Sequence, residues 1–479
     1  MNLSRIICFS SLLLFFLCQD GHGQSLIISN INVIDVEKKK TKEDMDVYVN
    51  EGIITRLSKH EKSKTYPSEA NVIDGSNQFL IPGFIDTHAH FAMGPIKISV
   101  ENHKPVLSVE LDTLLPKVSG GLLLSHGVTT ARDPGGHTDL TVSTKHQFRA
   151  DINAGPELYV AGSILDTLDF KNLATAVKTK TEVVNEIRNQ KNAGVDFVKL
   201  YTSLGPELID AAIKEAERLG LGTIAHLHGT TWTEASKLGI DNIVHIIPGS
   251  DYYLDEGDKK EYQESLVWGS KAFFKWFELV DLNGDKVKEL LKTLKKNGTS
   301  LDPTLVVFHA AFFGNKNTYQ SNELLDELPE SITNNWRNLF NFNIGWTDED
   351  FDLAQAVWPK VEKFLYMIYE EGIMLTAGTD ANNPWIVPGD SFHKELELMA
   401  NAGIPTSEVL KIGTINGAKL LGLDKRLGSV CKGKEADLVI LSANPLLDIK
   451  NTRKIERVIV NGVIIDEENH QAAQSSKVE

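Results

Sequence analysis

Two histidines separated by one residue, His88 and His90, end a short apolar run that begins at Phe84. In an extended strand, residues i and i+2 point to the same face, so the two imidazoles would lie side by side. Neutral imidazole is the commonest protein ligand for metal ions. The pair alone is a weak signal, because two nearby histidines often have no chemical role. It becomes informative only if further ligands converge on it.

Further candidate ligands follow apolar, β-rich runs later in the chain: Lys199, His226, His245 and Asp380. Any one of them would more often be a structural or surface residue. In a barrel of parallel strands, however, the carboxyl ends of all strands surround one site. Six potential ligands at expected strand ends therefore predict a metal centre on one rim.

The middle of the chain, residues 83–418, alternates between strand-like and helix-like segments. One helix is clear, because Pro206 marks its first turn, Gly220 follows its end and one face between them is apolar. This alternation predicts an α/β fold, a (β/α)8 TIM barrel. The expected strands end near the following residues: His90, Asp133, Leu165, Lys199, His226, His245, Val307 and Asp380.

Both ends of the chain contain strand-like segments without helices, in residues 24–82 and 419–470. Two short segments each separate a pair of apolar runs, as hairpin turns do: Asn50-Glu51-Gly52 and Asn461-Gly462. These segments predict one small β-sandwich built from both termini. Residues 471–479 are expected to form a disordered tail.

The N-terminus resembles a secretory leader. Arg5 supplies a positive charge, and Ile6 to Cys18 form an apolar stretch that is too short for a comfortable membrane span. We expect a signal peptide over residues 1–23 and a secreted or periplasmic protein, with a membrane or lipid anchor as the alternative. Only Cys431 lies outside this leader, so neither an internal disulfide nor thiolate ligation of a metal is expected.

The formal net charge is −16, which argues against nucleic acid or an anionic membrane surface as a partner. A small-molecule substrate is the remaining expectation. The hydrophobic content of 42% and the charged content of 24% are those of an ordinary globular protein.

Lys199 is the unusual candidate ligand. A lysine at the end of an apolar strand is partly desolvated, which favours the neutral amine. A neutral amine can add carbon dioxide, and the resulting carbamate could bridge two divalent cations that lie about 3.5–4 Å apart. The alternative is a lysine that reaches the surface along its aliphatic stem. Residue spacing alone does not favour either interpretation of Lys199.

The ordered motifs of the chain resemble those of the amidohydrolase superfamily. The nearest branch is the one that contains imidazolonepropionase-related and Xaa-Pro or Xaa-Arg dipeptidase-like enzymes with a carboxylated lysine. The resemblance covers essentially the whole chain after the leader. It rests on these segments: Ile81-Pro82-Gly83-Phe84-Ile85-Asp86, His88-Ala89-His90, Lys199, His226-Leu227-His228-Gly229, His245, Gly378-Thr379-Asp380, Thr414-Ile415-Asn416-Gly417-Ala418, Leu427-Gly428-Ser429 and Gly433-Lys434-Glu435-Ala436-Asp437-Leu438.

The resemblance implies two divalent metal ions, with Zn²⁺ the first choice and Mn²⁺ or Fe²⁺ as alternatives. One ion would bind His88, His90, Asp380 and carboxylated Lys199, and the other would bind Lys199, His226 and His245. A bridging water would be the nucleophile, with Asp380 as general acid and base. Homo-oligomers are common in similar enzymes, so a homo-oligomer is an open expectation.

Several nearby side chains could have either a chemical or a structural role. His228 could donate to the oxyanion, and Tyr201 could hold a substrate carboxylate; packing or support of the ligands is the alternative for both. Arg132, Asp133 and His137 could line the pocket or only make structural hydrogen bonds. His393 and Glu395 are expected to begin a helix without a chemical role. The segment between His245 and Asp380 is expected to form a lid or part of the substrate pocket, because it holds most of the tryptophans, although buried structural tryptophans are the commoner explanation: Trp268, Trp276, Trp336, Trp346 and Trp358.

These residues leave three functions open. The first is a secreted binuclear hydrolase that cleaves an amide bond in a dipeptide or an N-acyl amino acid. The second is a hydrolase of a cyclic amide, such as a lactam or imidazolone, or a deaminase. Mononuclear deaminases of this superfamily place a Glu shortly after the histidine of the fifth strand, whereas no carboxylate follows His226 before Glu234. The third, a metal-free binding or scaffold protein, conflicts with the complete ligand set.

Overall fold

The structure is a computed structural model that describes residues 25–101, 104–266 and 271–465. Its strands are β1 Leu26–Asp35, β2 Lys40–Asn50, β3 Ile53–Lys59, β4 Asn71–Asp74, β5 Phe79–Pro82, β6 Phe84–Asp86, β7 Ile96–Glu101, β8 Lys104–Val109, β9 Val128–Asp133, β10 Glu157–Val160, β11 Ile164–Asp166, β12 Ala174–Ala176, β13 Phe197–Leu200, β14 Gly222–Ala225, β15 Asn242–Val244, β16 Ser300–Asp302, β17 Leu438–Leu441, β18 Ile455–Val460 and β19 Val463–Ile464. Its helices are α1 Leu115–Ser125, α2 Thr138–Ala150, α3 Lys180–Ala193, α4 Pro206–Leu219, α5 Trp232–Leu238, α6 Lys259–Ser265, α7 Ala272–Leu279, α8 Asp285–Asn297, α9 Leu305–Phe312, α10 Glu330–Asn338, α11 Asp348–Glu371, α12 Asp390–Asn401, α13 Thr406–Lys411 and α14 Gly417–Leu420.

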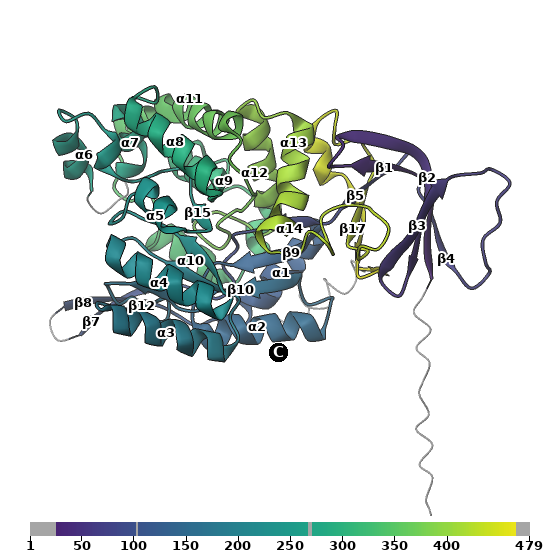
Figure 1. The fold of residues 1–479 in the computed structure, drawn as a ribbon, viewed down its shortest axis with the longest axis horizontal. Helices are drawn as coiled ribbons and strands as arrows, with labels where there is room; N and C mark the ends of the chain where they lie inside the picture. Colours follow the sequence, from purple (N-terminus) through teal and green to yellow (C-terminus); the bar gives the residue numbers. More distant parts are fainter. Residues whose placement is uncertain (1–24, 102–103, 267–270, 466–479) are drawn as a thin grey trace, which may run out of the picture.

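The middle of the chain is an α/β unit of parallel strands surrounded by helices (Figure 1). One sheet has the order β10-β9-β6, and a second has the order β12-β11-β13-β14-β15-β16. Isolated parallel bridges continue the pairing beyond these sheets, from Ala161 to Phe197, from Leu301 to Leu375 and from Ala89 to Ala381. This α/β arrangement is consistent with a TIM barrel.

The register of the parallel strands explains why the candidate ligands converge. Lys199 pairs with Ile224 on β14, and Ala225 pairs with Ile243 on β15. His226 directly follows β14, and His245 directly follows β15. Because parallel strands end at the same edge of a sheet, these side chains come to one rim.

Helix α4 has the bounds that the sequence predicts. Pro206 is its first residue, and Gly220 adopts a left-handed φ of 66° at its C-terminal end. Ile209, Ala212 and Ala216 lie on its buried face. Pro206 and Gly220 indicate the two ends of this helix, because proline is tolerated in the first turn of a helix and glycine readily adopts the left-handed conformation at its C-terminal cap.

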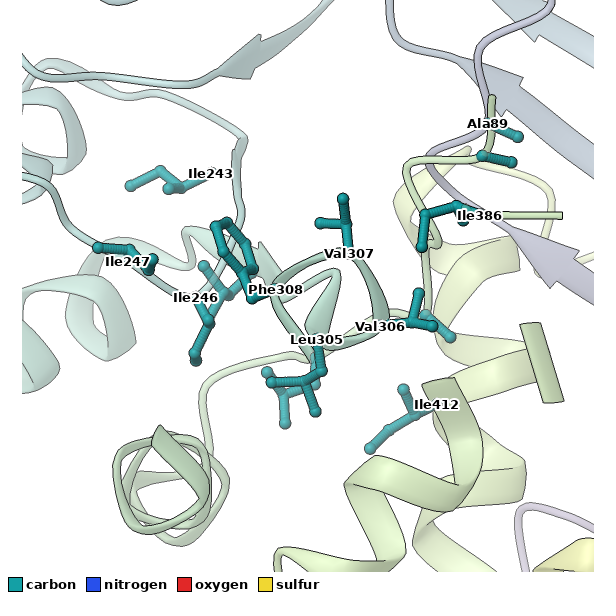
Figure 2. Close-up of a cluster of buried hydrophobic side chains, with 14 of the residues drawn as sticks. Ala89, Ile243, Ile246, Ile247, Leu305, Val306, Val307, Phe308, Ile386 and Ile412 are labelled. Carbon is teal, nitrogen blue, oxygen red and sulfur yellow. The ribbon is translucent and has the colours of Figure 1, made fainter. Parts of the chain in front are cut away.

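The strand expected to end near Asp380 is reduced to isolated bridges at Leu375 and Ala381. The strand expected near Val307 is wrong. The strand at this point is β16, which ends at Asp302, and Leu305–Phe312 forms helix α9. Its apolar side chains project from several sides of the helix and are all buried, so it lacks a polar face that would have revealed the helical period (Figure 2). The buried carboxylate of Glu395 accepts the backbone N–H groups of Leu305 and Val306, at 2.9 and 2.7 Å, and so fixes where the helix begins.

Strands from both termini pair in one eight-stranded sheet at one end of the molecule (Figure 1). Its order is β19-β18-β17-β5-β1-β2-β3, and β4 pairs with β1. Both expected hairpins are present, and their turn residues Glu51, Gly52, Asn461 and Gly462 have positive φ, as tight hairpin turns require. The sheet has its own apolar cluster, which includes Ile28, Val47 and Ile440.

Three sequence predictions concern residues outside the described ranges: the leader, the tail and Trp268. Within those ranges, none of the helices combines the length and the apolar character that crossing a bilayer demands.

Candidate metal and active site

All six predicted ligands line one cavity of about 200 Å³ at the carboxyl ends of the strands. His88 is 1% exposed, Lys199 is 2% exposed, and His90, His245 and Asp380 are each 6% exposed. Residues that are almost 300 positions apart in the chain therefore share one largely dehydrated space. The six side chains converge as the sequence predicts, and their role as metal ligands stays a prediction.

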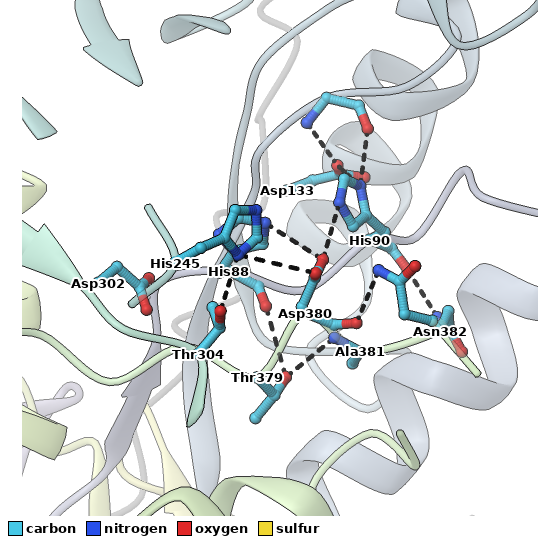
Figure 3. Close-up of polar contacts among 12 residues, drawn as sticks. His88, His90, Asp133, His245, Asp302, Thr304, Thr379, Asp380, Ala381 and Asn382 are labelled. Atoms are coloured by element: carbon cyan, nitrogen blue, oxygen red, sulfur yellow. Dashed lines mark hydrogen bonds and ion pairs between the residues drawn. The ribbon is translucent and has the colours of Figure 1, made fainter. Parts of the chain in front are cut away.

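His88, His90 and Asp380 form the tightest part of the cluster (Figure 3). Asp380 Oδ1 lies 3.3 Å from His88 Nε2 and 3.2 Å from His90 Nε2. The bridge between Ala89 and Ala381 sets this arrangement, because the residues that flank a bridge point to the opposite face from the bridged pair. Gly378 allows the two segments to approach, since a Cβ there would lie 2.5 Å from His88 Cβ.

His226, His245 and Lys199 complete the cavity wall from the neighbouring strands. The rings of His226 and His245 are 4.4 Å apart between centroids, and those of His88 and His245 are 5.2 Å apart. His245 and Asp380 both have left-handed backbone conformations, with φ of 73° and 60°. Such conformations are costly for residues other than glycine and occur preferentially at functional sites.

Burial sets the protonation of this cluster. Removal from water lowers the pKa of His88, His226 and His245 well below the ordinary value, so these imidazoles are neutral and can act as ligands. Burial also lowers the pKa of Lys199 to about 7, although the negative charge of Asp380 opposes this effect. For Asp380, burial is outweighed by His88 and His90, which hold its pKa well below the usual range.

A buried polar network lies behind the ligands. Asp86 accepts hydrogen bonds from the backbone of His88 at 2.9 Å and from the Thr379 hydroxyl at 2.8 Å, so it ties the first ligand segment to the last. The Thr87 hydroxyl donates to Asp302 at 2.6 Å, and Arg132 donates to the Thr87 carbonyl at 2.7 Å. Burial raises the pKa of Asp302 to about 6, against the attraction of Arg132.

Sequence reasoning missed Asp302 as a residue of this region. A signal was present, because Gly298 ends helix α8 and Pro303 follows three residues of β16. A glycine cap followed by a short run and a proline indicates a strand between them. The apolar run after Thr304 concealed it.

Two histidine rings are oriented by hydrogen bonds on their far sides. His90 Nδ1 lies 2.9 Å from the Gly135 carbonyl, and His245 Nδ1 lies 2.8 Å from the Thr304 hydroxyl. These contacts leave Nε2 of each ring free to act as a ligand, as in many metal sites. Thr304 immediately precedes α9, so Glu395, which fixes the start of that helix, also helps to position His245.

The predicted substrate contacts have different surroundings. Tyr201 lines the cavity, and its ring lies 4.9 Å from that of His226. His228 is exposed and lies outside the described cavity lining, with its ring 5.3 Å from His226. The extended geometry ends at Ala225, so the expected alternation does not reach His228. The roles of both residues stay predictions.

Arg132 and Asp133 are the last residues of β9 and are fully buried, which agrees with the prediction of structural hydrogen bonding. Asp133 accepts the backbone N–H groups of Phe91 and Gly135, each at 3.0 Å. His137 precedes helix α2. These three residues are absent from the described cavity lining.

The segment between His245 and Asp380 lines the cavity with phenylalanines. Trp276, Trp336, Trp346 and Trp358 are buried and do not belong to the described lining, which supports the simpler reading of the tryptophans. The lining instead contains Phe273, Val307, Phe308, Phe340 and Phe342.

The donor set suits a divalent metal ion. One ligand atom from each of His88, His90 and Asp380 lies within 4.8 Å of the others, and all three residues are buried. Neutral imidazoles and a carboxylate are ligands that Zn²⁺, Mn²⁺ and Fe²⁺ accept. These three residues therefore fit one divalent ion, and the second ion of the predicted pair stays a prediction.

Comparison with known families agrees with this geometry. The model of the amidohydrolase family matches residues 79–465. The chain belongs to the amidohydrolase family. The match begins at β5 and ends after β19, so it includes every predicted ligand.

Two curated members of this superfamily are similar over most of their length. A 5-methylthioadenosine/S-adenosylhomocysteine deaminase from Caldanaerobacter subterraneus is 24% identical over 481 aligned residues, which cover 92% of this chain and 93% of the relative. An imidazolonepropionase from Clostridium tetani is 24% identical over 422 residues, which cover 86% of each.

Among solved structures, a Xaa-Pro dipeptidase with bound methionine has a TM-score of 0.66 and 21% identity, over 92% of this chain and 99% of that one. This likeness shows a shared fold. The family match and the imidazolonepropionase and dipeptidase neighbours support the branch that the motifs indicated, and carboxylation of Lys199 stays a prediction. The protein is a hydrolase that acts on carbon–nitrogen bonds.

Proposed function

We propose that this amidohydrolase is a binuclear metal-dependent enzyme that cleaves the amide bond of a dipeptide or an N-acyl amino acid. The observation that carries the proposal is the position of Lys199. It is buried in the same cavity as four histidines and Asp380, rather than extended to the surface along its stem. A buried lysine among metal ligands is the arrangement that a bridging carbamate requires.

The residues divide into two ligand sets. His88, His90, Asp380 and carboxylated Lys199 would hold one ion, and Lys199, His226 and His245 would hold the other, with Zn²⁺ as the first choice. When bound, such ions lower the pKa of water and polarise a carbonyl oxygen.

The protein side chains supply the remaining chemistry. Asp380 is placed to accept the proton of the attacking water and to deliver it to the leaving amine. Tyr201 lines the cavity and His228 lies beside His226, where they would contact the substrate. Burial of the site limits competing water.

The second candidate is hydrolysis of a cyclic amide, or deamination, and the names of two similar proteins favour it. The position of Glu234 argues against deamination. This carboxylate accepts the Thr231 backbone N–H and caps helix α5 on the surface, and it is absent from the described cavity lining. Asp380 is the acidic residue in that lining.

The proposal also includes a closed barrel, a small β-sandwich and export of the protein from the cytoplasm. The isolated bridges support closure of the parallel strands into a (β/α)8 barrel. The separate apolar cluster of the terminal sheet supports a small β-sandwich from residues 24–82 and 419–470. Arg5 and the apolar stretch after it support export through a signal peptide.

The test is a screen of purified, zinc-loaded protein against dipeptides, N-acyl amino acids, cyclic amides and aminopurine nucleosides. Metal analysis and ¹³C NMR after exposure to labelled bicarbonate accompany the screen. We expect amide hydrolysis, about two ions per chain and a carbamate signal that Lys199→Ala removes. Deamination with one ion per chain would establish the second candidate instead.

A further inference from the structure

Four phenylalanines form a continuous surface that starts at a ligand histidine. The ring of Phe308 lies 5.8 Å from His245 and 5.3 Å from Phe273. Phe273 lies 6.1 Å from Phe342, which in turn lies 5.5 Å from Phe340. We call these four residues the aromatic wall. Because each contact is edge-to-face, the rings support one another in favourable geometry.

The wall faces the cavity rather than the protein core. Phe273, Phe340 and Phe342 are only partly buried, and all four wall residues line the cavity. Phe274, the next residue on α7, is 1% exposed and packs against Trp346 instead. Helix α7 therefore presents one phenylalanine to the cavity and keeps the adjacent one in the core.

The rest of this end of the cavity is also apolar, with Met93, Ile96, Ile164 and Leu173 in the lining. In the described lining, Lys199 is the basic side chain other than the histidines, and it lies in the ligand cluster. A charged group at the aromatic end would lose its hydration without gaining a partner of opposite charge. Burial of an unpaired charge is strongly unfavourable, so the wall disfavours charged groups.

We propose that the aromatic wall determines substrate specificity, and that it selects amides with an uncharged aromatic or branched aliphatic group next to the scissile bond. This inference rests on the proposed amide hydrolysis and narrows its substrate class. Small and charged acyl groups would be poor substrates, because they either leave the wall uncovered or lose hydration against it.

Matched substrates test the inference. N-phenylacetylglycine and N-acetylphenylalanine each add one aromatic ring to N-acetylglycine, on opposite sides of the amide, whereas N-succinylglycine adds a charge. We expect kcat/KM for at least one aromatic substrate to exceed that of N-acetylglycine by about tenfold or more. N-succinylglycine should be the poorest of the four. Equal values for all four would overturn the inference.

Two variants on helix α7 test whether the aromatic wall causes the preference for aromatic substrates. Phe273→Asn replaces part of the wall with a polar side chain, and Phe274→Leu perturbs only the neighbouring core position. We expect Phe273→Asn to reduce the preference for the aromatic substrate by about tenfold, and Phe274→Leu to keep the preference. A preference that both variants retain would show that the wall does not select the substrate.

A binding measurement separates this inference from the proposed function. Benzyl alcohol has an aromatic ring but no scissile amide, and its binding to the metal-loaded protein can be followed by saturation-transfer NMR. We expect binding to be several-fold weaker in Phe273→Asn than in wild type and in Phe274→Leu. If benzyl alcohol binds in this way but no amide is hydrolysed, the proposed amide hydrolysis is refuted, whereas the aromatic wall remains supported as a binding surface. Equal binding of benzyl alcohol to all three proteins would refute the inference that the aromatic wall binds aromatic groups.

Discussion

The two ends of the active-site cavity are built in different ways. At the ligand end, the side chains lie at or just beyond strand ends, and Asp380 lies beside the isolated bridge of Ala381. Buried hydrogen bonds through Asp86, Arg132 and Asp302 support them. At the aromatic end, the side chains come from α7, α9 and the segment after α10, and they are held by ring contacts. Directed hydrogen bonds fix positions closely, whereas apolar packing fixes shape and tolerates change.

This difference assigns separate tasks to the two ends. The chemistry needs ligands at fixed positions, and strand termini in a ladder provide them. Selectivity needs a surface that can vary without disturbing those ligands, and helices and loops outside the ladder provide it. Changes at the ligand end should therefore reduce turnover, and changes at the aromatic end should mainly alter KM.

Lys199→Ala should have the largest effect. Loss of the bridging ligand should remove several kilocalories per mole of transition-state stabilisation, so turnover should fall about 1,000-fold and metal content should drop. Short carboxylic acids should restore part of the activity by replacing the carbamate. Steady-state kinetics and metal analysis measure both effects. Lys214→Ala, on the exposed surface of α4, is the control, and unchanged turnover in Lys199→Ala would rule out the two-metal site.

Asp380→Asn should separate chemistry from metal binding within the ligand end. The amide can still act as a ligand but cannot accept a proton, so we expect kcat to fall about 10²–10⁴-fold while most of the metal remains. Single-turnover kinetics together with metal analysis check this result. Asp210→Asn, at a surface ion pair with Lys214, should behave like wild type. A near wild-type kcat in Asp380→Asn would place the proton transfer on another group.

Thr304→Val should have a smaller effect at the same end, because it removes only the hydrogen bond to His245 Nδ1. Thr304 already has a left-handed φ of 43°, and valine is equally β-branched, so the substitution adds little backbone strain. We expect metal affinity to fall about 10–100-fold in competition with a chromophoric chelator. Thr333→Val, in the buried face of α10, controls for the loss of a hydroxyl. Equal affinity in both variants would mean that His245 needs no such support.

Asn335→Ala should have the smallest effect, and only at the aromatic end. Asn335 makes two hydrogen bonds with the backbone of Ile96, at 2.8 and 3.0 Å, and so holds that cavity residue in place. Because each such bond contributes about 1 kcal/mol, KM for an aromatic substrate should rise a few-fold while kcat is kept. Asn334→Ala, at the exposed neighbouring position, is the control. A lower kcat with unchanged KM would show that the two ends are not separable.

The ligand end could be predicted because its residues obey local rules. Each ligand follows a short apolar run, and parallel pairing brings the ends of such runs together whatever lies between them. Asp302 escaped this logic, because the apolar segment from Leu305 to Phe312 has no polar face to distinguish a helix from a strand. Glu395 was placed correctly in a helix, but its contact with α9 depends on packing between distant segments.

The aromatic end could not be predicted in this way. Phe273 and Phe308 lie on different helices, and Phe342 lies beyond a third helix, α10, so no single periodicity relates their directions. Phe273 and Phe274 are identical neighbours, yet one lines the cavity and the other packs in the core. The difference arises from the orientation of α7 against its neighbours.

The sequence by itself determined most of the alternation of strands and helices, the hairpins of the terminal sheet and the six candidate ligands that line one cavity. These features follow from backbone preferences and from short patterns that act within a few residues. Only the tertiary structure decided which buried carboxylates support the ligands, where α9 begins and which phenylalanines face the cavity. Those outcomes depend on how side chains far apart in the chain share a limited space, and no local pattern encodes that competition.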